Sequence, residues 1–452
     1  MLTLTSLGGA GTVTGSKHLL RSGRRGILVD CGLFQGLKSL RLLNWKPLPV
    51  DPASIDAVLL THAHLDHSGY LPRLVREGFR GPIFCTDATM DVARLILRDS
   101  GHLQEKDAEY ANRKGFSKHH PALPLYTVRD AERAMKRFEP VDVHKPIALP
   151  GGATATFRWA GHILGAATIE VAWKGAKIVF SGDLGRYDDP VMVDPEPAPE
   201  ADYLVVESTY GDRLHERRDA TEALGEVVER TVSRGGTVVI PAFAVGRAQH
   251  LLYHLWKLKQ AGRLGLVPVY LDSPMSIEAS ELMGRHLEDL RLSPDVCRAV
   301  CGVAEYVRDV EASKAITASP MPKVIISASG MATGGRVLHH LRAYAPDARN
   351  TILFSGFQAA GTRGRAMLEG AREVKMFGEW IPVRAKVADL PMLSAHADAD
   401  EIMRWLSGFG RPPRKTFIVH GEPSASEALR VRIGRELGWD AEVSLQGETH
   451  TL

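Results

Sequence analysis

The first 200 residues carry short apolar runs and alternating apolar and polar positions, a pattern typical of β-strands joined by turns. We predict strands over residues 2–7, 27–30, 57–61, 154–159, 168–173, 177–180 and 203–206. Lys174-Gly175-Ala176 is short enough to join two of these strands as a tight hairpin. The polar stretch 105–118 is predicted to be a surface segment, and the proline-rich stretch 188–201 a loop.

The pattern changes near residue 209, where strand-like runs begin to alternate with amphipathic helical stretches. We predict strands over 237–241, 268–271, 323–327 and 351–355, and helices over 222–231, 248–260, within 276–310 and after Gly334. This alternation predicts a parallel, doubly wound sheet. Beyond residue 390 we predict a strand over 416–419, a helix over 424–437 and a short final strand.

Composition narrows the class of protein without identifying a function. A chain of 452 residues, 44% hydrophobic and 24% charged, fits a globular protein of two or three domains. Four cysteines are too few for a disulfide scaffold; no apolar run reaches the roughly 18–20 residues that cross a bilayer; and the first residues lack a secretory pattern. We therefore expect a cytoplasmic protein. The net charge of +3 does not identify a nucleic-acid-binding protein, and the scattered tryptophans predict no base-stacking platform.

The most specific feature is the run Thr61-His62-Ala63-His64-Leu65-Asp66-His67. In an extended segment, residues two apart face the same way, so His62 and His64 can share one metal ion. Asp66 and His67 follow at the turn into a helix and can face a second ion. Imidazole and carboxylate ligands suit Zn²⁺, and Mn²⁺ and Fe are also compatible. Because the run directly follows a strand, we interpret it as a metal site and not as chance surface histidines.

Three further residues can complete such a site. His162 stands between glycines in Gly161-His162-Ile163-Leu164-Gly165, Asp183 follows a strand in Ser181-Gly182-Asp183, and His420 ends a strand before Gly421. Each alone is more typical of a structural residue than of a ligand. Together with the first run they supply enough side chains for two ions.

The spaced set resembles the metallo-β-lactamase superfamily, whose His-x-His-x-Asp-His motif is followed by a histidine, an aspartate and a final histidine. Asp30 in LVDCG resembles the first motif of that superfamily. Glu207 in ESTYG, His396 in LSAHAD and His420 in VHGE resemble the three additional motifs of the β-CASP subgroup. That subgroup contains RNA- and DNA-processing nucleases, including ribonuclease J and the cleavage and polyadenylation endonuclease subunit. The resemblance covers essentially the whole chain, and its motifs follow in the right order.

The resemblance implies a centre of two zinc ions. It assigns His62, His64 and His162 to one ion, Asp66, His67 and His420 to the other, and Asp183 to both. Two ions about 3.5–4 Å apart can deprotonate a bridging water and polarise a phosphoryl oxygen. Asp30 is expected beside them as a carboxylate that orients a ligand histidine or the hydroxide. The candidate catalytic residues are Asp30, Asp183, Glu207 and His396.

The resemblance also pairs Glu207 with His396. A ribose 3′-oxygen leaves poorly until it gains a proton, and a histidine with a pKa near 6.5 can supply that proton. A neighbouring carboxylate would hold the tautomer of this histidine and raise its pKa. Without the order of the motifs, Glu207 would fit equally well as a strand-end carboxylate that caps a turn.

Three glycine-rich segments of the middle region follow strands and lead into helices, where backbone N–H groups can cradle a phosphate. The candidate phosphate- or RNA-binding residues are Arg247, Ser329, Thr333, Gly334, Gly335, Arg336 and Arg363. Taken one at a time, the segments are more typical of ordinary strand–helix turns than of phosphate-binding loops. In context they resemble the cleavage and polyadenylation branch more than ribonuclease J, which favours endonucleolytic cutting and leaves 5′-to-3′ exonucleolytic action open.

We therefore expect an α/β protein in which residues 1–208 and 390–452 form an αββα metallo-β-lactamase sandwich and residues 209–389 form an inserted β-CASP domain. The expected function is that of a zinc-dependent ribonuclease. A di-zinc-activated hydroxide would hydrolyse phosphodiesters of single-stranded RNA held between the domains, leaving 5′-phosphate and 3′-hydroxyl ends. The alternatives are a small-molecule hydrolase acting on thioesters or lactones, a non-catalytic RNA-binding subunit, and a nuclease acting on DNA. The sequence leaves open whether the native metal is Zn²⁺ or Mn²⁺ and whether the chain forms a homodimer.

Overall fold

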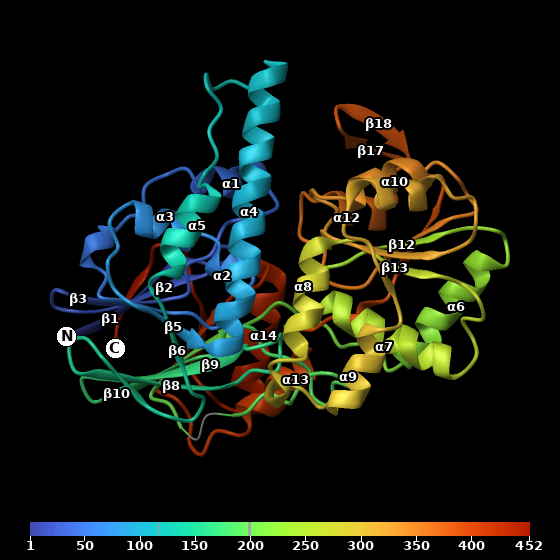
Figure 1. Cartoon of the computed structure of the whole chain (residues 1–452). Helices are drawn as coiled ribbons and strands as arrows, with labels where there is room; N and C mark the ends of the chain where they lie inside the picture. Colours follow the sequence, from blue (N-terminus) through green and yellow to red (C-terminus); the bar gives the residue numbers. More distant parts are fainter. Residues whose placement is uncertain (116, 198–199) are drawn as a thin grey trace. The chain divides into compact units, whose positions relative to one another are not determined.

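The computed structural model describes residues 1–115, 117–197 and 200–452, and these residues form two compact units (Figure 1). Unit 1 comprises Met1–Leu214 and His396–Leu452, and unit 2 comprises His215–Ala395. Residue 116 of the predicted surface segment and residues 198–199 of the predicted loop lie outside the described residues. Within the described ranges, no helix is both long and apolar enough to cross a membrane.

The described part of unit 1 contains two seven-stranded sheets. In spatial order, the first consists of β22 (Thr449–Thr451), β1 (Leu2–Gly8), β2 (Lys17–Ser22), β3 (Arg25–Val29), β4 (Ala57–Leu59), β5 (Ile83–Thr86) and β6 (Phe138–Val141). The second consists of β21 (Ala441–Val443), β20 (Lys415–Val419), β11 (Tyr203–Glu207), β10 (Ala176–Phe180), β9 (Ala167–Trp173), β8 (Ala153–Trp159) and β7 (Ile147–Leu149).

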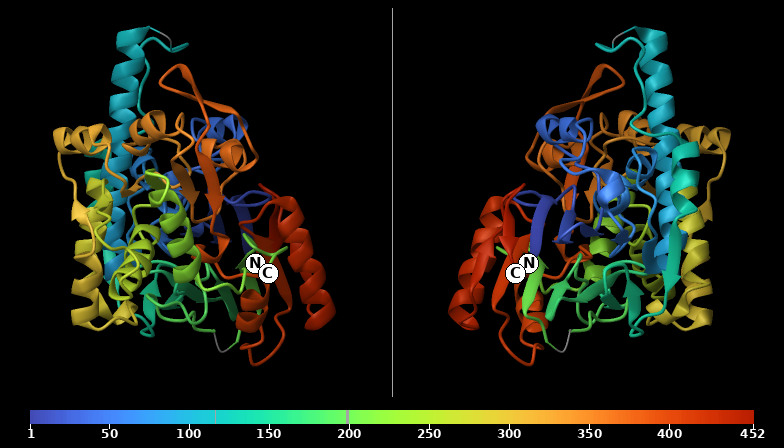
Figure 2. Two further views of the ribbon diagram at one scale, coloured as in Figure 1. Left: turned by 90° about the vertical axis from the view of Figure 1, so that its right-hand side faces the viewer. Right: turned by 90° about the vertical axis from the view of Figure 1, so that its left-hand side faces the viewer.

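Both sheets of unit 1 mix parallel and antiparallel pairs. Strands β3 to β6 are parallel in the first sheet, as are β10, β11, β20 and β21 in the second. β1 pairs antiparallel with β22, so the two ends of the chain lie side by side (Figures 1 and 2). The parallel strands matter for function because side chains that follow them gather at the same sheet edge.

The inner faces of the two sheets pack together in one apolar core. Leu20 and Ile27 of the first sheet and Phe157, Val171 and Phe417 of the second belong to this core. Successive side chains of a strand point to opposite faces, so these residues share the inward face of their strands.

Helices of unit 1 cover the outer faces of the sandwich. They are α1 (Lys38–Leu43), α2 (Leu65–Ser68), α3 (Leu71–Arg76), α4 (Asp87–Lys114), α5 (Val128–Met135), α13 (Ala399–Leu406) and α14 (Pro423–Glu436). α4 packs on β5, β6 and α5, whereas Trp405 of α13 and Leu429 of α14 pack on Val206 and Ile418 of the second sheet. The expected αββα sandwich is thus confirmed. The stretch predicted as a surface segment is largely the end of α4, whose C-terminal half extends beyond the sheets (Figures 1 and 2).

The described part of unit 2 is built on a six-stranded parallel sheet. Its strands, in spatial order, are β14 (Glu305–Tyr306), β13 (Val269–Leu271), β15 (Val324–Ser327), β12 (Val238–Pro241), β16 (Thr351–Phe354) and β19 (Lys386–Asp389). Its helices are α6 (Ala220–Val232), α7 (Arg247–Gln260), α8 (Pro274–Met283), α9 (Pro294–Cys301), α10 (Val310–Ala318), α11 (Val337–Tyr344) and α12 (Arg363–Leu368).

Alternate residues of this sheet enter two separate cores. Ile240 and Ile326 pack with α6, α7, α8 and α9, whereas Val239 and Ile325 pack with α11 and α12. Helices therefore cover both faces, and the predicted doubly wound sheet is confirmed. The helical region predicted over 276–310 is more broken than expected, because the two-residue strand β14 follows α9 and adds the sheet edge. A separate hairpin, β17 (Glu373–Met376) with β18 (Glu379–Pro382), has no counterpart in the predicted elements.

We expect Leu255→Ala in α7 to lower the free energy of unfolding by about 2–5 kcal/mol, because Leu255 is 0% exposed in the core of unit 2. Leu266→Ala is the matched control, since the side chain of Leu266 is 102% exposed in the same unit. Thermal and denaturant unfolding would compare both variants with the parent protein. Equal stabilities of the two variants would contradict the assigned core.

Candidate functional site

The predicted metal-binding side chains all lie in unit 1, close to the ends of strands. His62 and His64 follow β4, and Asp66 and His67 lie in the short helix α2. His162 follows β8, Asp183 follows β10, and His420 directly follows β20. The fold therefore brings together residues from both sheets that are separated by more than 350 positions in the sequence.

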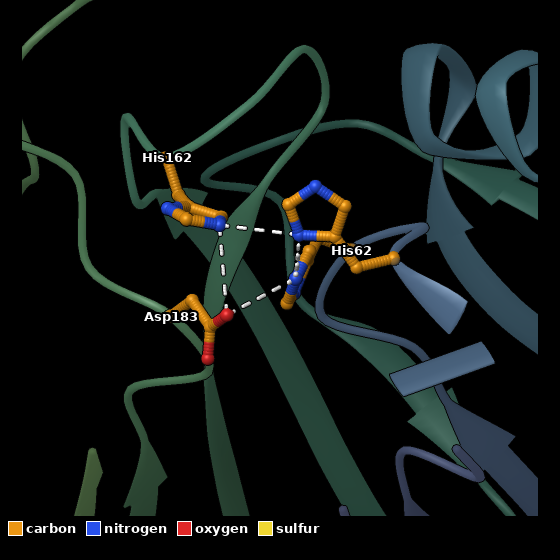
Figure 3. Close-up of side chains that lie close together, drawn as sticks. His62, His162 and Asp183 are labelled. Atoms are coloured by element: carbon orange, nitrogen blue, oxygen red, sulfur yellow. Dashed lines mark hydrogen bonds and ion pairs between the residues drawn. The ribbon is translucent and has the colours of Figure 1, made fainter. Parts of the chain in front are cut away.

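Three histidines and one carboxylate oxygen form the first ligand group. Nε2 of His62 lies 3.1 Å from Nδ1 of His64, and Nε2 of His162 lies 3.2 Å from the same Nδ1. Oδ2 of Asp183 lies 3.4 Å from Nε2 of His62 and 3.5 Å from Nε2 of His162. Figure 3 shows His62, His162 and Asp183 pointing toward one another. All four atoms could serve a single ion.

The second ligand group consists of Asp66, His67 and His420. Nε2 of His420 lies 3.2 Å from Nε2 of His67 and 3.3 Å from Oδ2 of Asp66. Oδ1 of Asp183, the oxygen that does not face the first group, lies 3.2 Å from Nε2 of His67. The carboxylate of Asp183 therefore presents one oxygen to each group.

The spacing within both groups fits a metal ion. Four ligands about 2.0–2.1 Å from a tetrahedral Zn²⁺ would be about 3.3 Å from one another, close to the observed separations. The chemistry of the atoms agrees, because neutral imidazole nitrogens and carboxylate oxygens bring several lone pairs to each centre. Such atoms repel one another unless a proton or a cation lies between them. The residues present therefore suit one cation in each group.

Asp30 orients ligands of both groups. Its backbone adopts φ 60 immediately after β3, an uncommon conformation for a residue other than glycine, and its Oδ2 accepts a 2.7 Å hydrogen bond from Nδ1 of His67. The Thr61 hydroxyl donates to the same carboxylate at 2.9 Å. Since that hydroxyl has only one proton, it must accept from Nδ1 of His62, which is 3.1 Å away. Both histidines are thereby held with Nε2 as the lone-pair nitrogen.

Thr209 performs the same task for His420. Its Oγ1 lies 3.1 Å from the carbonyl oxygen of His420 and 3.1 Å from Nδ1 of the same residue. The carbonyl can only accept, so the hydroxyl donates to it and accepts from Nδ1–H. Nε2 of His420 then faces Asp66 and His67 with its lone pair. Sequence reasoning assigned no role to Thr61 or Thr209, although both stand inside the quoted motifs.

We expect Thr209→Val to weaken metal affinity by roughly 10–100-fold, the usual effect of removing a group that orients a ligand histidine. Valine keeps the shape of threonine and removes only the hydroxyl group. Thr209→Ser, which keeps the hydroxyl, should retain most of the affinity. Competition with a chromophoric chelator would measure the three proteins, and equal affinities for valine and threonine would contradict the role assigned to the hydroxyl.

Burial and neighbouring charges set the protonation of these histidines. Burial, reinforced by the neighbouring imidazoles, lowers the pKa of His64 to about 3 and holds the pKa of His162 well below its usual value. Burial would also lower the pKa of His67, but the carboxylates of Asp183 and Asp30 outweigh it and raise that pKa well above the usual range. His67 therefore lies where positive charge is most favourable.

Glu207 and His396 form a pair beside the ligand groups. Nδ1 of His396 lies 3.2 Å from Oε1 of Glu207 and 4.0 Å from Oδ2 of Asp183. Glu207 is held in place because its oxygens accept hydrogen bonds from the backbone N–H groups of Leu184 and Thr209. Burial opposes a charge on His396, yet the Glu207 carboxylate raises its pKa above the usual value. The His396 side chain is 16% exposed, against 0% for Glu207, so the imidazole is the partner that solvent can reach.

The candidate phosphate-binding residues lie in unit 2, in the loops that follow the adjacent strands β15, β12 and β16 or at the first residue of the next helix. Arg336 donates to Oδ1 of Asp272 at 2.7 Å and to the carbonyl oxygen of Arg308 at 2.8 Å. Arg363 donates to the carbonyl oxygens of Lys375 and Ala332 at 2.6 and 3.1 Å. The structure thus places both guanidinium groups where they brace neighbouring loops.

The other candidates in these loops differ in their exposure. Arg247 opens α7 and is buried. Ser329 and Thr333 share a 3.0 Å hydrogen bond between exposed hydroxyls, and Gly334 and Gly335 follow them before α11. Phosphate binding by these seven residues stays a prediction.

Three family models match successive parts of the chain. They are a beta-lactamase superfamily domain over residues 25–241, a Beta-Casp domain over 248–367, and a Zn-dependent metallo-hydrolase RNA specificity domain over 380–444. The first and last include the predicted ligands, and the second lies within unit 2. The chain thus carries the domains of a metal-dependent hydrolase.

The chain is similar to several proteins along nearly its whole length. It is 38% identical to Ribonuclease TTHA0252 of Thermus thermophilus, with 95% of each chain covered. It is 32% identical to Transcription termination factor FttA of Methanosarcina mazei, with 96% of this chain and 69% of that protein covered. An RNase J-like protein of Methanocaldococcus jannaschii is 30% identical, with 93% of each chain covered.

A solved structure shares the fold at low sequence identity. A protein of unknown function from Enterococcus faecalis aligns with a TM-score of 0.54 and 13% identity, covering 100% of both chains. The domain order, the ligand geometry and the identity to full-length relatives agree with one another. The chain therefore belongs to the β-CASP subgroup of the metallo-β-lactamase superfamily.

Proposed function

We propose that the chain is a metal-dependent ribonuclease that hydrolyses phosphodiester bonds of single-stranded RNA, mainly at internal positions. The observation that carries the proposal is the Glu207–His396 pair, whose imidazole lies 4.0 Å from Asp183 beside two ligand groups. A hydrolase that releases a poor alkoxide leaving group needs such an acid, whereas hydrolysis of a thioester releases a thiolate, which does not. The relatives named as a ribonuclease and an RNase J-like protein add support for RNA as the substrate.

In this proposal the centre holds two ions, which we infer to be Zn²⁺ with Mn²⁺ as the alternative. The residues that would hold them are His62, His64, His162, Asp66, His67, His420 and the shared Asp183. When bound, the ions supply Lewis acidity, which lowers the pKa of water and draws negative charge from a phosphoryl oxygen.

The chain's own residues then supply orientation and a proton. Asp30, Thr61 and Thr209 each contact a candidate ligand histidine and fix which of its ring nitrogens carries hydrogen. Glu207 holds Nδ1–H of His396, so the protonated ring donates from Nε2 to the departing ribose 3′-oxygen. The scissile P–O bond breaks as the 3′-oxygen gains this proton. The water oxygen forms the new P–O bond and gives up a proton to solvent, which leaves a 5′-phosphate.

The first experiment incubates the purified protein with single-stranded RNA blocked at its 5′ end, beside DNA of the same sequence. Each reaction is run with zinc, with manganese and with a chelator, and the termini of the products are mapped. We expect internal cuts in RNA that carry 5′-phosphate ends and that disappear with the chelator. If DNA is cut equally well, the proposed substrate class widens from RNA to single-stranded nucleic acid in general.

A fully metallated protein that cuts neither strand would contradict the proposal. Hydrolysis of a thioester or lactone by the same preparation would then favour a small-molecule hydrolase. RNA binding without hydrolysis would favour a non-catalytic subunit. The cytoplasmic location, the homodimer, the domain boundaries at 208/209 and 389/390, and additional 5′-to-3′ exonucleolytic action stay predictions.

A further inference from the structure

The hairpin β17–β18 of unit 2 has one buried face and one exposed face. Val374, Met376 and Ile381 are buried in the core beside α11 and α12. On the opposite face, Lys375 and Trp380 are directly opposed cross-strand partners. The Cβ atoms of such partners stand about 5 Å apart, so the side chains of Lys375 and Trp380 are neighbours on this face. Figure 1 shows this hairpin as a two-stranded ribbon apart from the parallel sheet.

The aromatic residues of the hairpin are unusually exposed. Trp380 is 60% exposed and Phe377, at the turn, is 44% exposed. Phe377 stacks on the exposed ring of His339, with ring centroids 4.7 Å apart and planes inclined by 29°. The sequence suggested scattered tryptophans and no stacking platform, whereas the fold collects three rings on and beside one hairpin.

The turn itself indicates that the Phe377 ring is not there for folding. Phe377 and Gly378 adopt φ 52 and φ 86, the two positive values of a tight hairpin turn. Asparagine, aspartate and glycine favour this conformation, whereas a bulky residue is disfavoured at positive φ. A phenylalanine at this position therefore costs stability, and it gains only partial burial in return.

Positive charge is concentrated in the same segment. Residues 363–386 hold six arginines and lysines and three glutamates, so this segment accounts for the whole net charge of +3 of the chain. Two of the glutamates are paired with arginines, Glu369 with Arg365 at 2.6 Å and Glu379 with Arg342 at 2.9 Å. Exposed cations on and around the hairpin include Arg372, Lys375, Arg384 and Lys386.

We propose that the β17–β18 hairpin is a binding surface for single-stranded RNA, with Trp380 and Phe377 stacking on bases and Lys375 facing the phosphate backbone. Exposed aromatic rings interleaved with cations are what a flexible polyanion with flat bases requires, and such stacking tolerates any base sequence. The surface extends the proposed function, on which it rests, by naming a substrate site in unit 2 in addition to the candidate metal ligands of unit 1.

The test compares RNA affinity in proteins that all carry His396→Ala, so that the RNA is not consumed. Fluorescence anisotropy of a labelled oligouridylate would measure binding to the metal-loaded proteins. We expect Trp380→Ala to weaken binding roughly 5- to 150-fold, the effect of losing one base–aromatic stack, and Trp380→Phe to retain most of the affinity. Trp45→Ala is the matched control, because Trp45 is 52% exposed in unit 1 and should leave the affinity unchanged.

Two further variants separate binding from folding. Phe377→Asn suits the positive φ of the turn, so we expect a protein at least as stable as the parent with weaker RNA binding. Lys375→Glu should lower the slope of log Kd against log salt by about 0.7, the contribution of one phosphate contact with a single strand.

If Trp380→Ala leaves the RNA affinity unchanged, the hairpin proposal is wrong. If the protein that keeps His396 still binds and cuts RNA in that case, the ribonuclease function stands. A parent protein that neither binds nor cuts RNA would remove the proposed function and the hairpin surface with it. Sedimentation of the parent and Trp380→Ala proteins tests whether a second copy of the chain, and not RNA, binds this surface. A dimer that Trp380→Ala converts to a monomer would assign the surface to a second copy of the chain and overturn the RNA assignment.

Discussion

His396→Ala should reduce RNA cleavage by about 10²–10⁴-fold while the metal content stays that of the parent protein, because the imidazole supplies a proton and no ligand. His396 lies next to the ligand groups, 4.0 Å from Asp183, but its Nδ1 is committed to Glu207 at 3.2 Å. Single-turnover cleavage and elemental analysis of the same preparation would measure both quantities. Glu207→Gln should act in the same direction, because it removes the charge that raises the pKa of His396.

The leaving group provides a sharper readout than the rate alone. A p-nitrophenyl phosphodiester releases a phenolate that needs no proton, so His396→Ala should hydrolyse it nearly as fast as the parent does. The matched control is His144→Ala, since His144 also pairs with a glutamate, Glu196, at 2.6 Å in unit 1 but is exposed and belongs to neither ligand group. Full RNA cleavage by His396→Ala, or an equal loss on both substrates, would contradict the role of general acid.

Individual strands and helices could be predicted from local patterns, whereas the αββα layering and the candidate ligand set followed from the family resemblance. Strands such as residues 177–180 and helices such as 248–260 show their period directly, and β10 and α7 differ from these predictions by one residue. The candidate ligands stand at strand ends, where the order of the motifs indicates which side chains converge. Their chemistry is visible in a short run because His62, His64, Asp66 and His67 are close in sequence.

Features that depend on contacts between distant segments could not be predicted. Thr209 reaches His420 only because β11 and β20 are parallel neighbours, with Glu207 opposite Val419, and no local pattern shows that pairing. α4 continues through Gly101 to Lys114 although its last turns are polar, since its earlier residues pack on the first sheet. The β17–β18 hairpin was missed because its strands have four residues each and its turn contains phenylalanine in place of the usual asparagine.

Asp183→Asn should have the second large effect, because Asp183 is the side chain shared by both ligand groups. Its Oδ2 lies 3.4 Å from Nε2 of His62, and its Oδ1 lies 3.2 Å from Nε2 of His67. Asparagine keeps the shape but replaces one oxygen with an amide NH₂, which cannot donate a lone pair to a cation. One group then loses a ligand, and both groups lose the negative charge that offsets two divalent ions. We expect the bound metal to fall from two ions to at most one per chain.

Activity should fall with the metal, by more than the 10–100-fold that is usual for losing an orienting partner. Asp30→Asn supplies that comparison, since Asp30 contacts Nδ1 of His67 and not the nitrogen that faces the ligand atoms. We expect this substitution to weaken metal affinity without changing the number of ions bound at saturation. Asp142→Asn, an exposed residue paired with Lys145 at 2.8 Å, should change neither quantity. Elemental analysis after dialysis against limiting and saturating zinc separates the three variants. Two tightly held ions in Asp183→Asn would rule out the shared carboxylate, and a loss of activity with both ions retained would place Asp183 in proton transfer instead of metal binding.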